Sequence, residues 1–498
     1  MTHYTAPIVD SSFLLNDVFD VRRYGNLPVF KEMSEDLIDA ILTEAGKLAS
    51  DILHPVNASG DAEGCVLHGS DVKTPEGFQQ AYRAYADGGW MGLSCDPDYG
   101  GQGLPFTLLT IVNEYLATAN MAFAMYPGLS QGAYSAIWHH GDDAQKRAYL
   151  PNIVSGQWSG TMNLTEPHCG TDLGLLKTKA VPQADGTYRI SGAKIFISAG
   201  EHDLTENIIH LVLARIEGAP EGTKGISLFI VPKILVNDDG TLGARNEGVR
   251  CARLEDKMGI HANATCEMLY DDAIGYLIGA ENRGLNAMFT MMNEARLGVA
   301  IQGLAQSEIA YQNAAAYAKD RRQGRALSGP VDPEAAADPI IVHPDVRRTL
   351  LKIRAFNEAA RALAIWGAIQ SDVINHAPDE AERQKADDLL GLLTPVMKGV
   401  MTDLGFENAV EAQQMLGGHG YIREWGMEQF VRDARIAKIY EGANGVQALD
   451  LVGRKLARNG GRAVMTFFGE IDAFVKAHAN DNTMADYLTP LVEARKDQ

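Results

Sequence analysis

The apolar pattern of this chain changes twice along its length, and the two changes limit the folds that it can adopt. Residues from about 28 to 156 show mostly helical spacing, and helical spacing returns from Gly284 onward. Between them, short apolar runs such as Ile208–Leu213 and Ile226–Val231 are separated by turn residues, as expected for buried strands. Helices, then strands, then helices predict an α+β fold. No G-x-G-x-x-G follows a predicted strand, which argues against a Rossmann fold.

The length of 498 residues requires more than one hydrophobic core. We expect an N-terminal helical domain with an extension over residues 1–158, a middle β domain over 159–280 and a C-terminal helical domain over 281–460. A stretch rich in Pro and Ala, from Gly324 to His343, is predicted as an insertion between two long helices. Residues 461–498 are predicted to form a C-terminal helical extension, one helix that then frays.

Local signals place three further elements. Ser34 before two acidic residues predicts the start of a helix, because a serine hydroxyl can cap the first free backbone N–H groups. Helical spacing from Leu108 to Ala122 predicts another helix. Asp185-Gly186 between two short runs predicts a hairpin turn.

Charge and cysteine content exclude several classes of protein. The formal net charge of -20 argues against nucleic-acid binding, which needs a basic surface. The five cysteines are scattered and include no CxxC pair, so we expect neither disulfides nor a metal site. We see no unbroken apolar run of roughly 20 residues and no signal peptide. The sequence therefore predicts a soluble, cytoplasmic protein that does not bind a membrane.

Two segments of the predicted β domain have side chains suited to a flat cofactor. The loop Thr161–Asp172 offers the hydroxyls of Thr165 and Thr171 together with backbone N–H groups, which could hold a ring oxygen and a pyrophosphate. Phe196 and Ser198 are two apart on a predicted strand, so both side chains should point to one face. Taken alone, the loop is more simply interpreted as an ordinary polar turn, and Phe196 as a phenylalanine of the core.

Three segments of the C-terminal half are candidates for catalysis or ligand contact. Glu294 and Arg296 share a long predicted helix, where they could also be a solvated charge pair. The glycines of Gln414–Tyr421 allow close approach of the backbone to a ligand, or simply end a helix. Glu441 lies at a predicted helix-to-loop junction. Burial can raise the pKa of such a carboxyl, so that it can take a proton from a weak carbon acid.

Taken together and in this order, the motifs resemble those of the acyl-CoA dehydrogenase family. The resemblance covers roughly Met33 to Arg458. The matching segments are Trp90–Leu93 with Tyr99–Gly103, Thr165–Pro167 with Gly170–Asp172, Phe196–Ser198, Arg296, Gln414–Gly418 and Ile439–Gly442.

The resemblance implies an FAD enzyme with a helical domain, a β-barrel or sheet domain and a C-terminal four-helix bundle. Its reaction would be α,β-dehydrogenation of an acyl-CoA to the 2-enoyl-CoA, with Glu441 as the base and flavin N5 as the hydride acceptor. The implied partners are the acyl-CoA, an electron-transferring flavoprotein, and further copies of the chain in a homodimer or homotetramer.

The extended N-terminus, the insertion and the tail most resemble the subgroup containing 3-(methylthio)propionyl-CoA dehydrogenase. This resemblance implies that substrate, in dimethylsulfoniopropionate degradation. A general short-, medium- or long-chain acyl-CoA dehydrogenase of fatty-acid β-oxidation is the alternative. Two further alternatives are an enzyme like the acyl-CoA oxidases and a non-catalytic FAD-binding relative.

The resemblance also assigns roles to single residues. Arg321, Gln414 and Gly418 match positions that contact the FAD of a neighbouring subunit. The substrate contacts implied are Thr171, Asn293, Arg296 and Gly442. The cofactor contacts implied are Met162, Leu164, Thr165, Thr171, Phe196, Ser198, Arg321, Gln414, Gly417 and Gly418.

Three departures from the family pattern are visible. Arg321–Gly324 is one residue shorter than the usual Arg-x-x-Phe-Gly and lacks the Phe. Ala443 replaces a frequent Thr after Glu441-Gly442. Ala295 occupies the position where a minority of the family carry the base, which favours Glu441 over Glu294 as the base.

Overall fold

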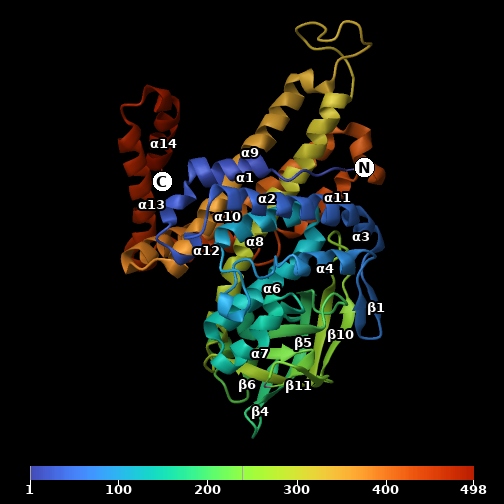
Figure 1. Ribbon diagram of the computed structural model, residues 1–498, viewed down its shortest axis with the longest axis vertical. Helices are drawn as coiled ribbons and strands as arrows, with labels where there is room; N and C mark the ends of the chain where they lie inside the picture. The colour runs from blue at the N-terminus through green and yellow to red at the C-terminus, as the bar shows by residue number, and fades with distance from the viewer. Residues whose placement is uncertain (1, 238, 498) are drawn as a thin grey trace.

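The β-strands gather at one end of the molecule, with helices packed over them and a long helical bundle rising from them (Figure 1). The computed structural model describes residues 2–237 and 239–497. The predicted α+β architecture is confirmed: helices precede and follow one main sheet.

The N-terminal region is helical. Ser34 caps α2, because its hydroxyl oxygen accepts a hydrogen bond from the N–H of Leu37 at 3.2 Å, as the sequence predicted. A short hairpin, β1 (Val66–His68) and β2 (Asp71–Lys73), interrupts the helices. The α-helices of the N-terminal region are α1 (Ile8–Phe13), α2 (Glu35–Lys47), α3 (Asn57–Glu63), α4 (Phe78–Asp87), α5 (Phe106–Ala119), α6 (Met121–His140) and α7 (Asp143–Val154).

The prediction of a single helix from Leu108 to Ala122 is wrong, because two helices, α5 and α6, share this stretch. The helical conformation is interrupted at Asn120, whose φ of -159° and ψ of 94° are extended. The Asn120 side chain accepts a hydrogen bond from the N–H of Phe123 at 3.0 Å and so caps α6. Because apolar spacing continues across the break, periodicity alone could not locate it.

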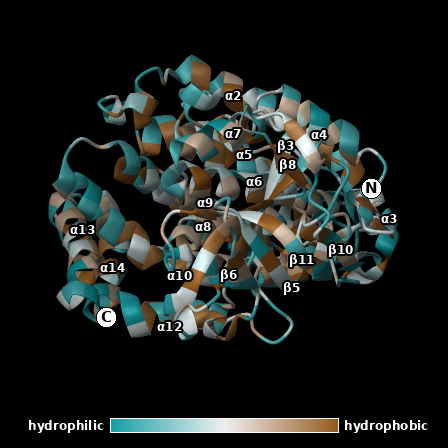
Figure 2. Ribbon diagram, turned by 90° about the horizontal axis from the view of Figure 1, so that it is seen from below, coloured by the Kyte–Doolittle hydropathy of each residue, from teal (hydrophilic) through white to brown (hydrophobic). Residues whose placement is uncertain are grey.

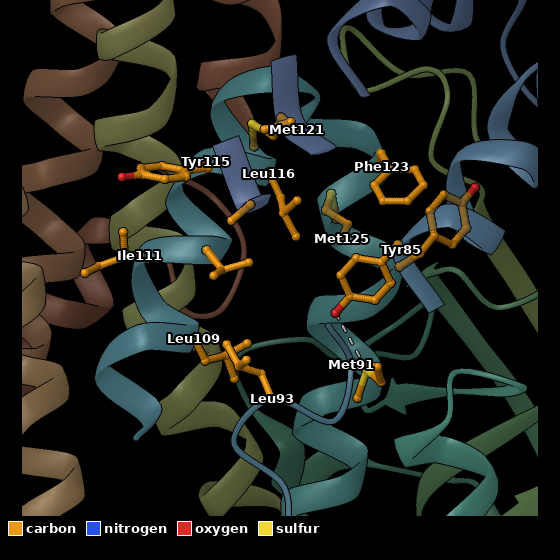
Figure 3. Close-up of a cluster of buried hydrophobic side chains, with 14 of the residues drawn as sticks. Tyr85, Met91, Leu93, Leu109, Ile111, Tyr115, Leu116, Met121, Phe123 and Met125 are labelled. Atoms are coloured by element: carbon orange, nitrogen blue, oxygen red, sulfur yellow. Dashed lines mark hydrogen bonds between the residues drawn. The ribbon is translucent and has the colours of Figure 1, made fainter. Parts of the chain in front are cut away.

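The buried faces of α4, α5 and α6 form the core of this region (Figure 3). Tyr85 points toward Met91, and Phe123 and Met125 of α6 lie beside them. Tyr115 of α5 also donates a hydrogen bond to Ser11 Oγ at 2.9 Å, which joins the N-terminal extension to the core.

The main sheet has seven strands in the order β10-β11-β5-β4-β6-β3, with β7 pairing both β11 and β6. β3 and β4 run parallel to β6, and the other pairs are antiparallel. The Asp185-Gly186 turn joins β4 to β5 as predicted, and Gly186 has a φ of 85°. The strands are β3 (Trp158–Asn163), β4 (Lys179–Pro182), β5 (Tyr188–Ser198), β6 (Asn207–Ile216), β7 (Ile226–Pro232), β10 (Val249–Leu254) and β11 (Thr265–Ile278). A separate pair is β8 (Ile234–Val236) with β9 (Leu242–Arg245).

A β-bulge interrupts the alternation of side chains in β5. Ile197 pairs with Cys266 and Lys194 with Met268, so two residues of β5 face one residue of β11. Phe196 lies in this bulge with a φ of 59°. Simple alternation therefore does not hold through this part of β5, and the shared face of Phe196 and Ser198 stays a prediction.

Four helices form the C-terminal bundle, in which α10 packs against the other three. The stretch between α8 and α9 is irregular, as predicted, and the buried Asp338 carboxylate accepts hydrogen bonds from the N–H groups of Ala326 and Asp332. The helices are α8 (Gly284–Asp320), α9 (Pro344–His376), α10 (Glu380–Met415) and α11 (Met427–Ile436), and a short α12 (Asn444–Asp450) follows.

Helix α10 also has the length and composition of a membrane span, the one such helix within residues 2–237 and 239–497. Its buried face packs on α8 and α9 in the bundle.

The C-terminal tail forms two helices rather than the single fraying helix predicted. They are α13 (Arg462–His478) and α14 (Ala485–Asp497), which lie side by side at the edge of the molecule in both views (Figures 1 and 2). The Arg495 guanidinium of α14 lies 3.8 Å from the centre of the Phe468 ring of α13. This cation–π contact holds the second helix against the first.

Candidate active site

A cavity of about 130 Å³ lies between α5, α6 and α8, beside the ends of β3 and β5 and the segment after α11. Most of its wall is apolar, for example Leu129 of α6 and Val299 of α8. Five of the α8 residues in the wall recur at three- and four-residue intervals, which is the spacing of one helix face. These are Met291, Glu294, Ala295, Gly298 and Gln302.

The cavity brings together residues that are far apart in the sequence. Met162 and Ser198, predicted flavin contacts, line it together with Glu441, the predicted base. Glu294, the rival carboxylate, lines it too. Thr171 and Asn293 are exposed and do not belong to the wall.

Glu441 has an unusual backbone conformation in the loop between α11 and α12. Its φ of 55° is in the left-handed region, which is uncommon for a residue with a side chain and clusters at functional sites. The Gln447 amide donates hydrogen bonds to the carbonyl oxygens of Glu441 at 3.1 Å and Gly442 at 3.0 Å. A Cβ at Gly442 would lie 2.7 Å from that amide nitrogen, so this position needs glycine.

A buried lysine that the sequence reasoning missed holds the same loop. Lys398 of α10 donates hydrogen bonds to the carbonyl oxygen of Gly442 at 2.9 Å and to Asn444 Oδ1 at 2.8 Å. Tyr440 Oη donates to Gln302 Oε1 on α8. Glu441 is therefore fixed from two helices of the bundle.

The electrostatics around Glu441 suit a base that works near neutral pH. Burial raises the pKa of Glu441 to about 7, while the cations of Arg296 and Lys398 oppose the rise. Arg296 is itself buried, with Nη1 3.7 Å from Asp450 Oδ2. A carboxyl with this pKa is largely ionised just above pH 7 and is still basic enough to accept a proton.

The family resemblance implies that Glu441 takes a proton while a flavin is reduced, and the arrangement around Glu441 then predicts how that step depends on pH. If Glu441 must be ionised, the rate should rise about tenfold per pH unit below pH 7 and level off above it. Replacing Lys398 by Met removes a cation that lowers the pKa of Glu441, so the inflection should move upward by roughly one pH unit. Anaerobic stopped-flow bleaching of the flavin between pH 5.5 and 9 measures both profiles.

The control for this prediction is Lys224→Met, which removes an exposed lysine from the β region. Its profile should match that of the unmodified enzyme. An unmoved inflection in Lys398→Met, or a rate that does not change between pH 5.5 and 9, would contradict the prediction.

The segments that follow Met162 and precede Ser198, two residues of the cavity wall, have the features of a cradle for a flat, polar cofactor such as FAD. Phe196 is 60% exposed although it is a large aromatic on a strand that has neighbours on both sides. The hydroxyls of Thr165, Thr171 and Ser198 make no hydrogen bond within the described residues. An exposed ring and three free hydroxyls on adjoining segments fit an isoalloxazine and its polar substituents.

A buried ion pair supports the cradle from behind. Lys194 Nζ, fully buried, donates to Glu166 Oε1 at 2.9 Å and to the carbonyl oxygen of Leu164 at 3.0 Å. The N–H of Ile195 donates to the carbonyl oxygen of Thr165 at 2.9 Å. Burial lowers the pKa of Lys194 to about 8, and Glu166 opposes that fall. The pair thus fastens the loop after β3 to the bulged part of β5.

A second group of predicted FAD contacts lies at the other end of the bundle. Arg321 follows the last residue of α8, roughly 37 Å along the helix from Arg296. Tyr317 Oη and His419 Nδ1 share a hydrogen bond of 3.0 Å, which joins this end of α8 to the segment after α10. The members of the group, all exposed, are Arg321, Gln414, Gly417 and Gly418. The structure therefore separates them from Glu441.

Comparison with known proteins gives the family. Residues 58–157, 161–273 and 282–456 match the N-terminal, middle and C-terminal domains of acyl-CoA dehydrogenases. The chain is 46% identical to the 3-methylmercaptopropionyl-CoA dehydrogenase of Ruegeria pomeroyi, over 93% of this chain and 78% of that protein. It is 36% identical to the broad-specificity linear acyl-CoA dehydrogenase of Mycobacterium tuberculosis, over 100% and 82% respectively.

Two solved structures share the fold. Butyryl-CoA dehydrogenase of Megasphaera elsdenii gives a TM-score of 0.68 at 27% identity, covering 84% of this chain and 98% of that one. A chain from a structure of the electron transferring flavoprotein of Acidaminococcus fermentans gives 0.69 at 26% identity, covering 86% and 99%. The chain therefore belongs to the acyl-CoA dehydrogenase family, and it is an FAD-dependent oxidoreductase that dehydrogenates acyl-CoA thioesters.

Proposed function

We propose that Glu441 is the base that removes the α-proton of an acyl-CoA bound in the cavity. The observation that carries this proposal is the setting of Glu441: a backbone with positive φ, a half-buried carboxyl with a pKa of about 7 and a place in the same wall as Ser198. FAD, when bound, supplies the acceptor for the β-hydrogen as hydride.

The residues around Glu441 each have a part in this chemistry. Arg296 and Lys398 lower the pKa of the carboxyl, so that enough of it is ionised at neutral pH. Met162, Leu129 and Val299 supply an apolar wall that keeps water from the reacting carbons. The hydroxyl of Ser198 and the ring of Phe196 would orient the flavin, and Thr165 with the backbone of Met162 and Leu164 would hold its edge.

The proposed substrate is 3-(methylthio)propionyl-CoA. The Ruegeria pomeroyi relative, 46% identical, is a 3-methylmercaptopropionyl-CoA dehydrogenase, which supports this choice over a longer fatty acyl-CoA. We also propose an electron-transferring flavoprotein as the electron acceptor and a cytoplasmic homo-oligomer as the working form. In that oligomer Arg321, Gln414 and Gly418 would contact the FAD of a neighbouring subunit.

We further propose the division into domains at 1–158, 159–280, 281–460 and 461–498. The first boundary falls where β3 begins and the second before α8. The third falls between α12 and α13.

The test is anaerobic reduction of the FAD-loaded enzyme by a panel of acyl-CoA thioesters. Propionyl-, butyryl-, octanoyl- and 3-(methylthio)propionyl-CoA are mixed with enzyme, and bleaching of the flavin absorbance is followed. We expect the methylthio substrate to give the highest kcat/KM. Faster bleaching by octanoyl-CoA would contradict the substrate, and peroxide release during aerobic turnover would indicate an oxidase.

A further inference from the structure

A second carboxyl, Glu294, faces the cavity in addition to Glu441. It lies on the α8 face that also presents Ala295 and Gly298 to the cavity. Ser135 of α6 donates a hydrogen bond to Glu294 Oε1 at 2.6 Å, which fixes the orientation of the carboxyl. Within the described residues Oε2 has no hydrogen-bond partner, and it is not sealed away from the cavity.

The surroundings of Glu294 differ from those of Glu441. Arg296 and Lys398 lie near Glu441, whereas no cation in the described part of the chain pairs with Glu294. Burial raises the pKa of Glu294 to about 7, and the Ser135 hydroxyl opposes that rise. Near neutral pH a large share of this carboxyl therefore keeps its proton, and a protonated carboxyl is a hydrogen-bond donor.

The cavity wall around Glu294 includes apolar residues of α6 and α8, beside the polar Gln131 of α6. Met291 lies one turn earlier on α8, and its side chain fills the space beside Gly132 of α6. Ser135 pairs with Oε1, so the free oxygen, Oε2, is the atom that a ligand in the cavity can pair with. A hydrocarbon chain cannot form that hydrogen bond, whereas an acyl group with a heteroatom can.

We propose that Glu294, held by Ser135, is a specificity residue that donates a hydrogen bond to a heteroatom carried by the acyl group. This inference rests on the proposed function, because it assumes that the acyl chain occupies the cavity. The substrate class is an acyl-CoA with an oxygen or sulfur acceptor in the acyl chain. An ether oxygen accepts more strongly than a thioether sulfur, so the preference should be larger for oxygen.

Three acyl-CoA thioesters of one length test the proposal. Pentanoyl-, 3-(methylthio)propionyl- and 3-methoxypropionyl-CoA differ only in whether the fourth chain atom is CH₂, S or O. For the enzyme and each variant, the selectivity is the kcat/KM of the oxygen or sulfur substrate divided by that of pentanoyl-CoA. Glu294→Leu removes the donor and should lower the oxygen selectivity roughly tenfold. Glu294→Gln keeps a donor of similar shape and should hold the ratio within about threefold of the original.

A binding measurement separates recognition from turnover. In enzyme that carries Glu441→Gln, which should not consume substrate, calorimetry gives the Kd of the same three thioesters. We expect Glu294→Leu in this background to raise the Kd of 3-methoxypropionyl-CoA about tenfold relative to that of pentanoyl-CoA. Glu217→Leu, at an exposed site in the β region, is the control and should leave the Kd ratio unchanged.

Two results would overturn the proposal while the proposed function stands. If Glu294→Leu slows or weakens all three substrates equally, its role is structural. If Glu294→Gln stops bleaching by all three, Glu294 transfers a proton and does not select the acyl group. If the unmodified enzyme is bleached by none of the three nor by any other acyl-CoA, the proposed function fails, and this inference fails with it.

Discussion

Replacement of Glu441 by Gln should stop acyl-CoA from reducing the flavin while both ligands still bind. Glutamine has nearly the volume of glutamate, so the loop fixed by Lys398 and Gln447 should keep its shape. An amide cannot accept the α-proton, and loss of a general base typically costs 10²–10⁴-fold in rate. Anaerobic stopped-flow bleaching measures the rate, and the flavin spectrum with acyl-CoA present reports binding.

Glu217→Gln is the matched control, because it makes the same chemical change at an exposed position in the β region. Its bleaching rate should be that of the unmodified enzyme. Undiminished bleaching in Glu441→Gln would show that another group takes the proton. Glu294 would then be the first candidate, since it lines the same cavity.

The sequence predicted the larger divisions of the fold because they depend on repeated local patterns. The strand run of Ile226–Val231 and the helix start at Ser34 are both observed. The break at Asn120 and the bulge at Phe196 were missed, since each is a departure at one residue inside a regular pattern. Helix α14 was missed for a different reason: the contact between Arg495 and Phe468 that holds it is long-range.

The candidate site was predictable only in part. The family resemblance supplied Met162, Ser198 and Glu441, and the structure places all three at one cavity. The buried cation Lys398 was missed, although the sequence contains a signal for it. Lys398 lies among the apolar residues of the buried face of α10. A charged residue at a buried position needs a partner, so it marks either an ion pair or a site.

Lys194 illustrates the same limit in the sheet. Its position in β5 faces the interior, and the partner that makes this tolerable, Glu166, is 28 residues away in the sequence. Strand periodicity gives the direction of a side chain and not the identity of the group that it meets. Only the folded chain shows that this pair lies behind the loop expected to hold the flavin.

Removal of the Arg361 guanidinium should lower the free energy of unfolding more than any other single substitution proposed above. Arg361 of α9 is 1% exposed and donates two hydrogen bonds to Glu114 Oε1, at 2.9 and 2.7 Å, and one to Glu308 Oε2 at 3.2 Å. Glu114 belongs to α5 and Glu308 to α8, so the cation joins the N-terminal region to the bundle. Arg361→Met would leave two buried carboxylates facing each other, at a cost of about 3–5 kcal/mol.

Guanidinium-induced unfolding, followed by circular dichroism with FAD at fixed concentration, measures this cost. Lys352→Met is the control on the same helix, because its ion pair with Glu411 is partly exposed and should contribute less than about 1 kcal/mol. Adding Glu114→Gln and Glu308→Gln to Arg361→Met should recover most of the loss, since the penalty comes from unpaired charge. If Arg361→Met unfolds at the same denaturant concentration as Lys352→Met, the three charges do not hold α5 against the bundle.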